Sequence, residues 1–113
     1  MGITVLSDKA AEESTYIVTV AFTDEDGTAV TPNSITWTLT DSDGNTINSR
    51  SGVSIAVPAA SNDIVLQGDD LAIQRPSMLR RRMTISAPYD SGAGSSLPFR
   101  GEIEFEITPL LNV

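Results

Sequence analysis

The segment at 34–46, SITWTLTDSDGNT, constrains the fold more than any other part of the chain. Ile35, Trp37 and Leu39 alternate with three threonines, which is the period-two pattern of a β-strand with one buried face. The DSDGN sequence that follows favours a tight reversal, because aspartates bond to nearby backbone N–H groups and glycine accepts positive φ. Trp37 is the only tryptophan, and burying it is worth at most about 5 kcal/mol. The segment therefore predicts a strand that organises the core.

Three other segments alternate in the same way, at 15–22, 80–89 and 99–108. The first is apolar on both faces, so we expect it in the middle of a sheet or beneath a loop. In the last, Phe105 points inward and the neighbouring glutamates point outward. Weaker patterns predict short strands at 3–6, 53–57, 63–66 and 71–73, one helical turn at 7–14, and a flexible turn at 90–96.

Short strands separated by turn signals at intervals of roughly ten residues predict an all-β fold. The length of 113 residues fits one domain, spanning 1–113. A tryptophan on an early central strand is the way in which immunoglobulin-like domains fill the space between their sheets. We therefore expect an immunoglobulin-like antiparallel two-sheet sandwich of about seven or eight short strands. Its expected core contains Ile35, Trp37, Leu39, Ile85 and Phe105.

The chain contains neither cysteine nor histidine, and its formal net charge is −8. Histidine is the commonest general base and the commonest metal ligand, so we expect neither an enzyme nor a cofactor. The negative charge opposes direct, sequence-independent binding to nucleic acid. The N-terminus lacks the basic and apolar regions of a signal peptide, and no apolar run is long enough to predict a membrane span.

Two acidic turns share the pattern T-D-x-D-G, at 23–27 and 40–44. Asp24 and Asp26 in the first, and Asp41 and Asp43 in the second, place carboxylates at alternate positions, as calcium-binding loops do. The same residues also make ordinary hairpin turns, and neither segment continues to the glutamate of an EF-hand. We prefer the plain turn and keep calcium binding as the alternative.

Four of the seven basic residues lie within positions 75–82. Arg75, Arg80 and Arg82 are therefore candidates for contact with an acidic partner surface. The alternative is structural: if the strands on either side of DSGAGSS pair as a hairpin, Arg82 lies near Glu106 and the charges pair across the strands. The preferred interpretation is cross-strand pairing, and the two are compatible.

The apolar tail contains Leu110, Leu111 and Val113 after Pro109. Large apolar side chains are costly to leave in water, at about 1.5–3 kcal/mol each. The tail is therefore expected either to fold back over the domain or to bury itself against a neighbouring subunit. The second alternative predicts a homo-oligomer, with a trimer as one arrangement, or a subunit docked on a larger shell.

Three stretches resemble the small immunoglobulin-like domains of tailed-bacteriophage virion structural proteins and related prophage genes. They are VAFTDEDGTAVTPNSITWTLTDSDGN at 20–45, DIVLQGDDLAI at 63–73 and MTISAPYDSGAGSSLPFRGEIEFEI at 83–107. The resemblance implies a non-enzymatic structural module located in the virion, either a capsid decoration or cement protein or a neck–tail accessory subunit. Its partners are other virion proteins or further copies of itself, and it brings no catalytic residues.

The alternative function is a binding module for carbohydrate- or calcium-dependent adhesion to cell surfaces. Sugar-binding sites usually present exposed aromatic rings, and this chain has only one tryptophan, two tyrosines and three phenylalanines. Most of them fall on positions that are expected to face inward. The scarcity of aromatic residues therefore favours the structural class.

Overall fold

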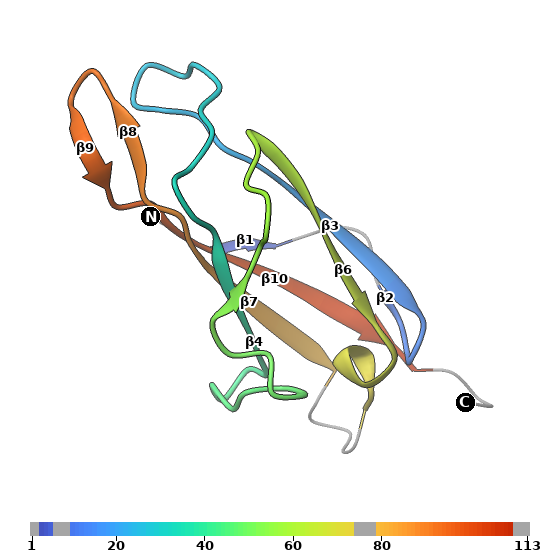
Figure 1. Cartoon of the computed structure of the whole chain (residues 1–113). Coiled ribbons are helices and arrows are strands. Elements are labelled where there is room, and N and C mark those ends of the chain that lie inside the picture. Colours follow the sequence, from blue (N-terminus) through green and yellow to red (C-terminus); the bar gives the residue numbers. More distant parts are fainter. Residues whose placement is uncertain (1–2, 6–9, 74–78, 110–113) are drawn as a thin grey trace.

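The computed structural model describes residues 3–5, 10–73 and 79–109, which form an all-β fold with one short 3-10 helix (Figure 1). The strands are β1 (Ile3–Val5), β2 (Ala10–Ala11), β3 (Thr15–Ala21), β4 (Thr36–Thr40), β5 (Val53–Ser54), β6 (Ser61–Gln67), β7 (Arg80–Ser86), β8 (Tyr89–Ser91), β9 (Gly94–Leu97) and β10 (Arg100–Thr108). The 3-10 helix η1 (Gly68–Leu71) follows β6. The all-β prediction is confirmed.

The strands form one large sheet, one small sheet and a separate hairpin. The large sheet has the order β1-β10-β7-β4-β5, with β2 also paired to β10. The small sheet consists of β3 and β6, and the hairpin of β8 and β9. β1 and β2 run parallel to β10, whereas the other pairs are antiparallel. The expectation of a wholly antiparallel fold is therefore wrong where the N-terminal strands join the sheet.

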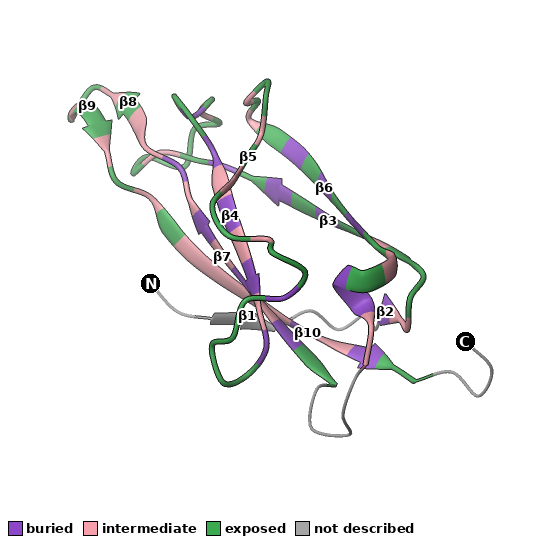
Figure 2. Cartoon of the chain, turned by 60° about the horizontal axis from the view of Figure 1, so that its bottom comes forward, coloured by how far each residue is buried: buried purple, intermediate pink, exposed green. Residues whose placement is uncertain are grey.

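The small sheet lies across one face of the large sheet, and the apolar core fills the space between them (Figures 1 and 2). Buried and exposed residues alternate along β6 and over most of β3, so each strand presents one face to the core (Figure 2). The rings of Tyr16 and Phe105 stack at 4.7 Å and join the two sheets directly. The five residues predicted for the core, Ile35, Trp37, Leu39, Ile85 and Phe105, are all buried.

Several predicted elements differ from the observed ones. The strand expected at 53–57 is shorter than predicted, because only Val53–Ser54 (β5) is a strand, and Val57 is 80% exposed. The segment 71–73 is not a strand, because Leu71 ends η1 with its side chain buried. Within 7–14, residues 7–9 lie outside the described part, and Ala10–Ala11 is a strand rather than helix. The segment 90–96 is not a simple flexible turn, since it belongs to the β8–β9 hairpin and raises the strand number above the seven or eight expected.

β3 alternates as predicted but does not lie in the middle of a sheet. Its only paired strand among the described residues is β6. Val18 and Val20 face the core, whereas Ile17 is 55% exposed on the outer face. The apolar residues on both faces of β3 therefore have different environments, and the outer ones are available for contacts.

Candidate interaction surface

The two acidic turns have the same hydrogen-bond geometry. In the first, Asp24 Oδ1 accepts the backbone N–H groups of Asp26 and Thr28 at 2.9 and 3.0 Å. In the second, Asp41 Oδ1 accepts the N–H groups of Asp43 and Asn45 at the same two distances. Gly27 and Gly44 follow with φ of 81° and 89°, which only glycine adopts readily. The shared T-D-x-D-G pattern therefore forms the same turn in both places.

The first turn brings three carboxylates together. One oxygen each of Asp24, Glu25 and Asp26 lies within 4.8 Å of the others. Asp24 is bonded to its own turn, and Glu25 Oε1 accepts hydrogen bonds from Ser91 Oγ at 2.9 Å and Tyr89 OH at 3.4 Å. These hydrogen bonds explain why the carboxylates lie close together: they belong to a turn that is hydrogen-bonded to the β8–β9 hairpin. We therefore retain the plain-turn interpretation and leave calcium binding to a direct test.

Arg80 and Arg82 form a charge ladder with glutamates on the outer face of β7 and β10. Arg80 Nη1 donates to Glu104 Oε1 at 2.6 Å and its Nη2 to Glu106 Oε1 at 3.0 Å. Arg82 Nη2 donates to Glu104 Oε2 at 3.3 Å. The hydrogen bond from Arg80 lowers the pKa of Glu104 below its ordinary value. Cross-strand pairing of these charges is confirmed, and a partner contact through them stays a prediction.

The register of this ladder differs from the predicted one. Arg82 lies opposite Glu104, and Glu106 lies opposite Arg80. The predicted pairing of Arg82 with Glu106 is therefore shifted by two residues. A shift of two keeps every side chain on the same face of the sheet, so the opposite charges still meet. The reversal is centred one residue earlier than predicted: Ser86 pairs with Arg100 and Tyr89 with Leu97, both symmetric about residue 93, whereas the predicted pairing requires a centre at residue 94.

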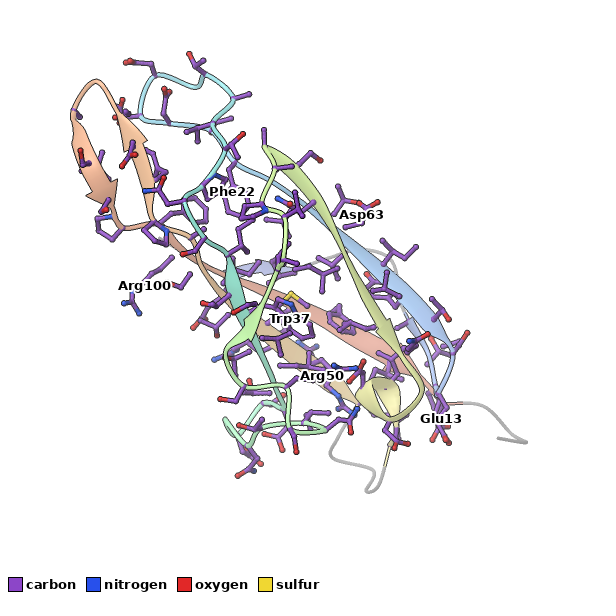
Figure 3. The ribbon with its side chains drawn as sticks, in the orientation of Figure 1. Glu13, Phe22, Trp37, Arg50, Asp63 and Arg100 are labelled. Atoms are coloured by element: carbon purple, nitrogen blue, oxygen red, sulfur yellow. The ribbon has the colours of Figure 1, made fainter. Side chains whose placement is uncertain are left out.

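A buried charged cluster joins the layers where η1 follows β6. Asp70 is completely buried, and its Oδ1 accepts hydrogen bonds from Arg50 Nε at 2.8 Å and Asn48 Nδ2 at 2.9 Å. Its Oδ2 accepts from the Gln67 backbone N–H at 3.1 Å and from Arg50 Nη2 at 3.3 Å. The Arg50 guanidinium also lies 5.9 Å from the centre of the Trp37 ring (Figure 3). The cluster therefore attaches η1 to the tryptophan strand.

Arg81 is the second cation of this cluster, and unlike Arg50 it is fully buried. Its Nε donates to the backbone oxygen of Asp70 at 3.1 Å, and its Nη2 donates to the backbone oxygen of Ala72. Burial lowers the pKa of Arg81, while the charges of Asp41 and Asp70 act in the opposite direction. Two carboxylates thus balance the charges of Arg50 and Arg81. Because these groups satisfy one another, the cluster has a structural role.

The outer face of the small sheet is apolar at its middle and carries little charge. Ile17 on β3 lies opposite Val65 on β6, and the two side chains are 55% and 47% exposed. In the next pair, Thr19 Oγ1 donates to Asp63 Oδ1 at 2.7 Å. Figure 3 shows Asp63 pointing away from the core. The other outward residues are Thr15, Ala21, Ser61 and Gln67. We define these eight residues as the small-sheet face.

The two sheets differ in the length of their edge strands. The large sheet ends in β5, with two residues, and β1, with three. Both strands of the small sheet have seven residues. Natural proteins protect exposed edges with short strands, lysine, proline or bulges. β6 has none of these and carries one charged residue, Asp63. β3 has none of these either and carries no charged residue, so the open edges of β3 and β6 are the least protected ones among the described strands.

The remaining predicted contact residues lie outside the described part of the chain. These are Arg75, Leu110, Leu111 and Val113. Sequence reasoning also missed two features. Arg81 lies two residues before Met83 and four before Ile85, so the period of two already placed it on the inner face. Ile17 and Val65 gave no such signal, because an apolar residue in a strand is expected to face a core.

Comparison with family models, curated proteins and solved structures gives no match for this chain. Among the described residues, no helix has the length and hydropathy needed to cross a membrane.

Proposed function

We propose that this chain is a non-enzymatic, immunoglobulin-like structural module of a virus particle, acting as a capsid decoration or cement protein or as a neck–tail accessory subunit. It works through protein–protein contacts, with other virion proteins or with copies of itself. The observation that carries the proposal is the small-sheet face, where Ile17 and Val65 expose apolar surface above a long sheet edge. Exposed apolar surface beside an unprotected edge is typical of a protein contact site.

The strand order supports the immunoglobulin-like part of the proposal. In immunoglobulin domains the C, F and G strands pair in one sheet, and the B and E strands in the other. Here β4, β7 and β10 pair in one sheet and β3 with β6 in the other, in the same chain order. Trp37 on β4 then takes the position of the buried tryptophan of strand C.

Adhesion to carbohydrate receives less support from the contacts. Sugar rings stack on exposed aromatic faces, and none of the six aromatic residues is fully exposed. Phe22, Trp37 and Phe105 are buried, while Tyr16, Tyr89 and Phe99 are partly buried. Protein contact through the small-sheet face is therefore the better supported function.

The test is binding to particles that are produced from the same genome without this chain. Purified protein is mixed with these particles and sedimented, and we expect saturable binding at a fixed ratio. Ile17→Lys should weaken binding, because it charges the small-sheet face, whereas Val57→Lys makes the same change on a loop and should leave binding intact. No binding to particles, combined with retention on a glycan array, would contradict the proposal in favour of adhesion.

A further inference from the structure

The asparagines of the described chain differ in the residue that follows them. An asparagine deamidates when the backbone nitrogen of the next residue attacks its side-chain carbonyl carbon, so a small next residue favours the reaction. Asn33 and Asn48 are both followed by serine. Asn45 and Asn62 are followed by the bulkier threonine and aspartate. The sequence context therefore favours Asn33 and Asn48.

Asn48 lies in a strained turn between β4 and β5. The N–H of Arg50 donates to the carbonyl of Ile47 at 3.0 Å and closes the turn, in which Asn48 and Ser49 have φ of 51° and 57°. Positive φ at both central residues is type I′ geometry, which suits asparagine at the first and glycine at the second, so Ser49 is strained. Both residues are exposed, and within the described residues the Ser49 N–H has no hydrogen-bond acceptor. The attacking nitrogen is free, and leaving this geometry relieves strain.

The side-chain amides of Asn33 and Asn48 both donate to an aspartate, but the two aspartates differ in burial. Asn33 Nδ2 donates to Oδ1 of Asp90 at 3.1 Å, and Asp90 is exposed. Asn48 Nδ2 donates to Oδ1 of the completely buried Asp70 at 2.9 Å. The same chemical change therefore has different structural consequences at the two positions.

We propose that Asn48 is a deamidation site, and that its conversion to a carboxylate releases the turn at 47–50 from Asp70. The Ser49 nitrogen attacks Cγ of Asn48, and its proton leaves with the side-chain NH₂ group as ammonia. Water then adds across one of the two C–N bonds of the succinimide ring. The product is aspartate or isoaspartate, so a neutral amide is exchanged for a negative charge.

The product does not fit the position that the amide occupies. Asn48 donates a hydrogen bond to Asp70, whereas an ionised carboxylate has only acceptors and would face the Asp70 oxygen with like charge. The two arginines of the buried cluster are already balanced by two carboxylates, so a third adds an excess negative charge. Such repulsion is strongest where water is excluded. The turn is therefore expected to move away from Asp70 into solvent.

Incubation of the purified chain in mildly alkaline buffer, followed by tandem mass spectrometry of its peptides, tests the reaction. Product should accumulate several-fold faster at Asn48 than at Asn33, whose own N–H is fixed by a hydrogen bond to the Pro88 carbonyl at 2.7 Å. In concentrated urea the two Asn-Ser sites lose their structure and should react at similar rates. A folded chain in which Asn48 does not react, or reacts no faster than Asn33, would overturn the assignment.

A second experiment tests the release of the turn. Asn48→Asp reproduces the aspartate product, and Asn33→Asp makes the same change at the exposed site. In Asn48→Asp the Arg50 amide, which closes the turn, should exchange with solvent several-fold faster than in the wild type. The Gln67 amide should stay protected, because its bond to Asp70 Oδ2 does not involve Asn48. Both amides should be unchanged in Asn33→Asp. Unchanged Arg50 exchange in Asn48→Asp, or equal acceleration of both amides, would contradict a local release.

Discussion

Replacing Asp70 with asparagine tests whether the buried charged cluster stabilises the fold. The substitution keeps the size of the side chain but removes its charge and one of its two acceptor oxygens. Arg50, which donates to both oxygens, loses its counterion, and an amide N–H₂ group is placed against existing donors. Arg81 also loses one of the two carboxylates whose charges act on it. We expect a substantial loss of stability.

The magnitude follows from the burial of the two partners. Removing one member of a buried ion pair costs about 3–5 kcal/mol. The Arg50 side chain is 35% exposed and can regain some hydration, so the lower end of this range, about 3 kcal/mol, applies. A domain of this size has a total stability of about 5–15 kcal/mol. Asp70→Asn should therefore remain folded but unfold at a clearly lower urea concentration.

The assay is urea unfolding followed by fluorescence of Trp37, the only tryptophan. Asp69→Asn is the matched control, because the neighbouring carboxylate is exposed and should change stability by less than about 0.5 kcal/mol. Equal unfolding free energies for Asp70→Asn and Asp69→Asn at pH 7 would refute the assigned role of the cluster.

The same pair of variants predicts a dependence on pH. Burial alone would raise the pKa of Asp70, but hydrogen bonds from Arg50, Asn48 and Gln67 outweigh it and lower the pKa below its ordinary value of 3.8. A lowered pKa in the folded state stabilises the fold above the unfolded value, and this stability is lost as the pH falls through the folded pKa. Wild type and Asp69→Asn should therefore lose more stability below pH 3.8 than Asp70→Asn does.

Three further predictions concern the core and the turns. Trp37→Ala should cost about 3–5 kcal/mol in urea unfolding followed by circular dichroism, because it leaves a large cavity between the sheets; an unchanged unfolding free energy would contradict the central place of this strand. Calcium or EDTA should leave the melting temperature unchanged, because the carboxylates of Asp24 and Asp41 already accept backbone hydrogen bonds within their own turns. A saturable rise of the melting temperature with calcium would show that calcium binds to the folded state. Gly44→Ala should cost about 1–2 kcal/mol in the same urea assay, because its φ is 89°; no loss would mean that the turn tolerates a side chain.

The sequence predicted the strands whose alternation separates apolar from polar residues. Ile35, Trp37 and Leu39 are buried while the threonines between them are less so, because β4 has one face toward the core. In β10 the alternation is clear only toward its C-terminal end, where Phe105 and Ile107 are buried and Glu104 and Glu106 are partly exposed. In both strands the hydrophobic effect and the period of two favour the same orientation, and the prediction succeeds.

The features that could not be predicted depend on contacts between distant segments. The two acidic turns look alike in sequence, but only Asp41 is buried, because β4 brings it toward Arg81. Asp70 lies in the GDD sequence at 68–70, which has the composition of an ordinary turn, yet Arg50 reaches it from a separate loop. The outward position of Ile17 has no local cause, since it depends on the outer face of the small sheet being left exposed in the described part of the chain.

The measurement that tests the proposed function most directly is thiol labelling of the assembled particle. The chain contains no cysteine, so Ala21→Cys on the small-sheet face and Ala93→Cys on the β8–β9 hairpin each introduce one exposed thiol. Both thiols should react quickly in the dilute free chain. In the assembled particle, Ala21→Cys should be protected and should react more slowly than Ala93→Cys. Equal labelling rates of Ala21→Cys in the free and the assembled chain would contradict the proposal that this face is a protein contact.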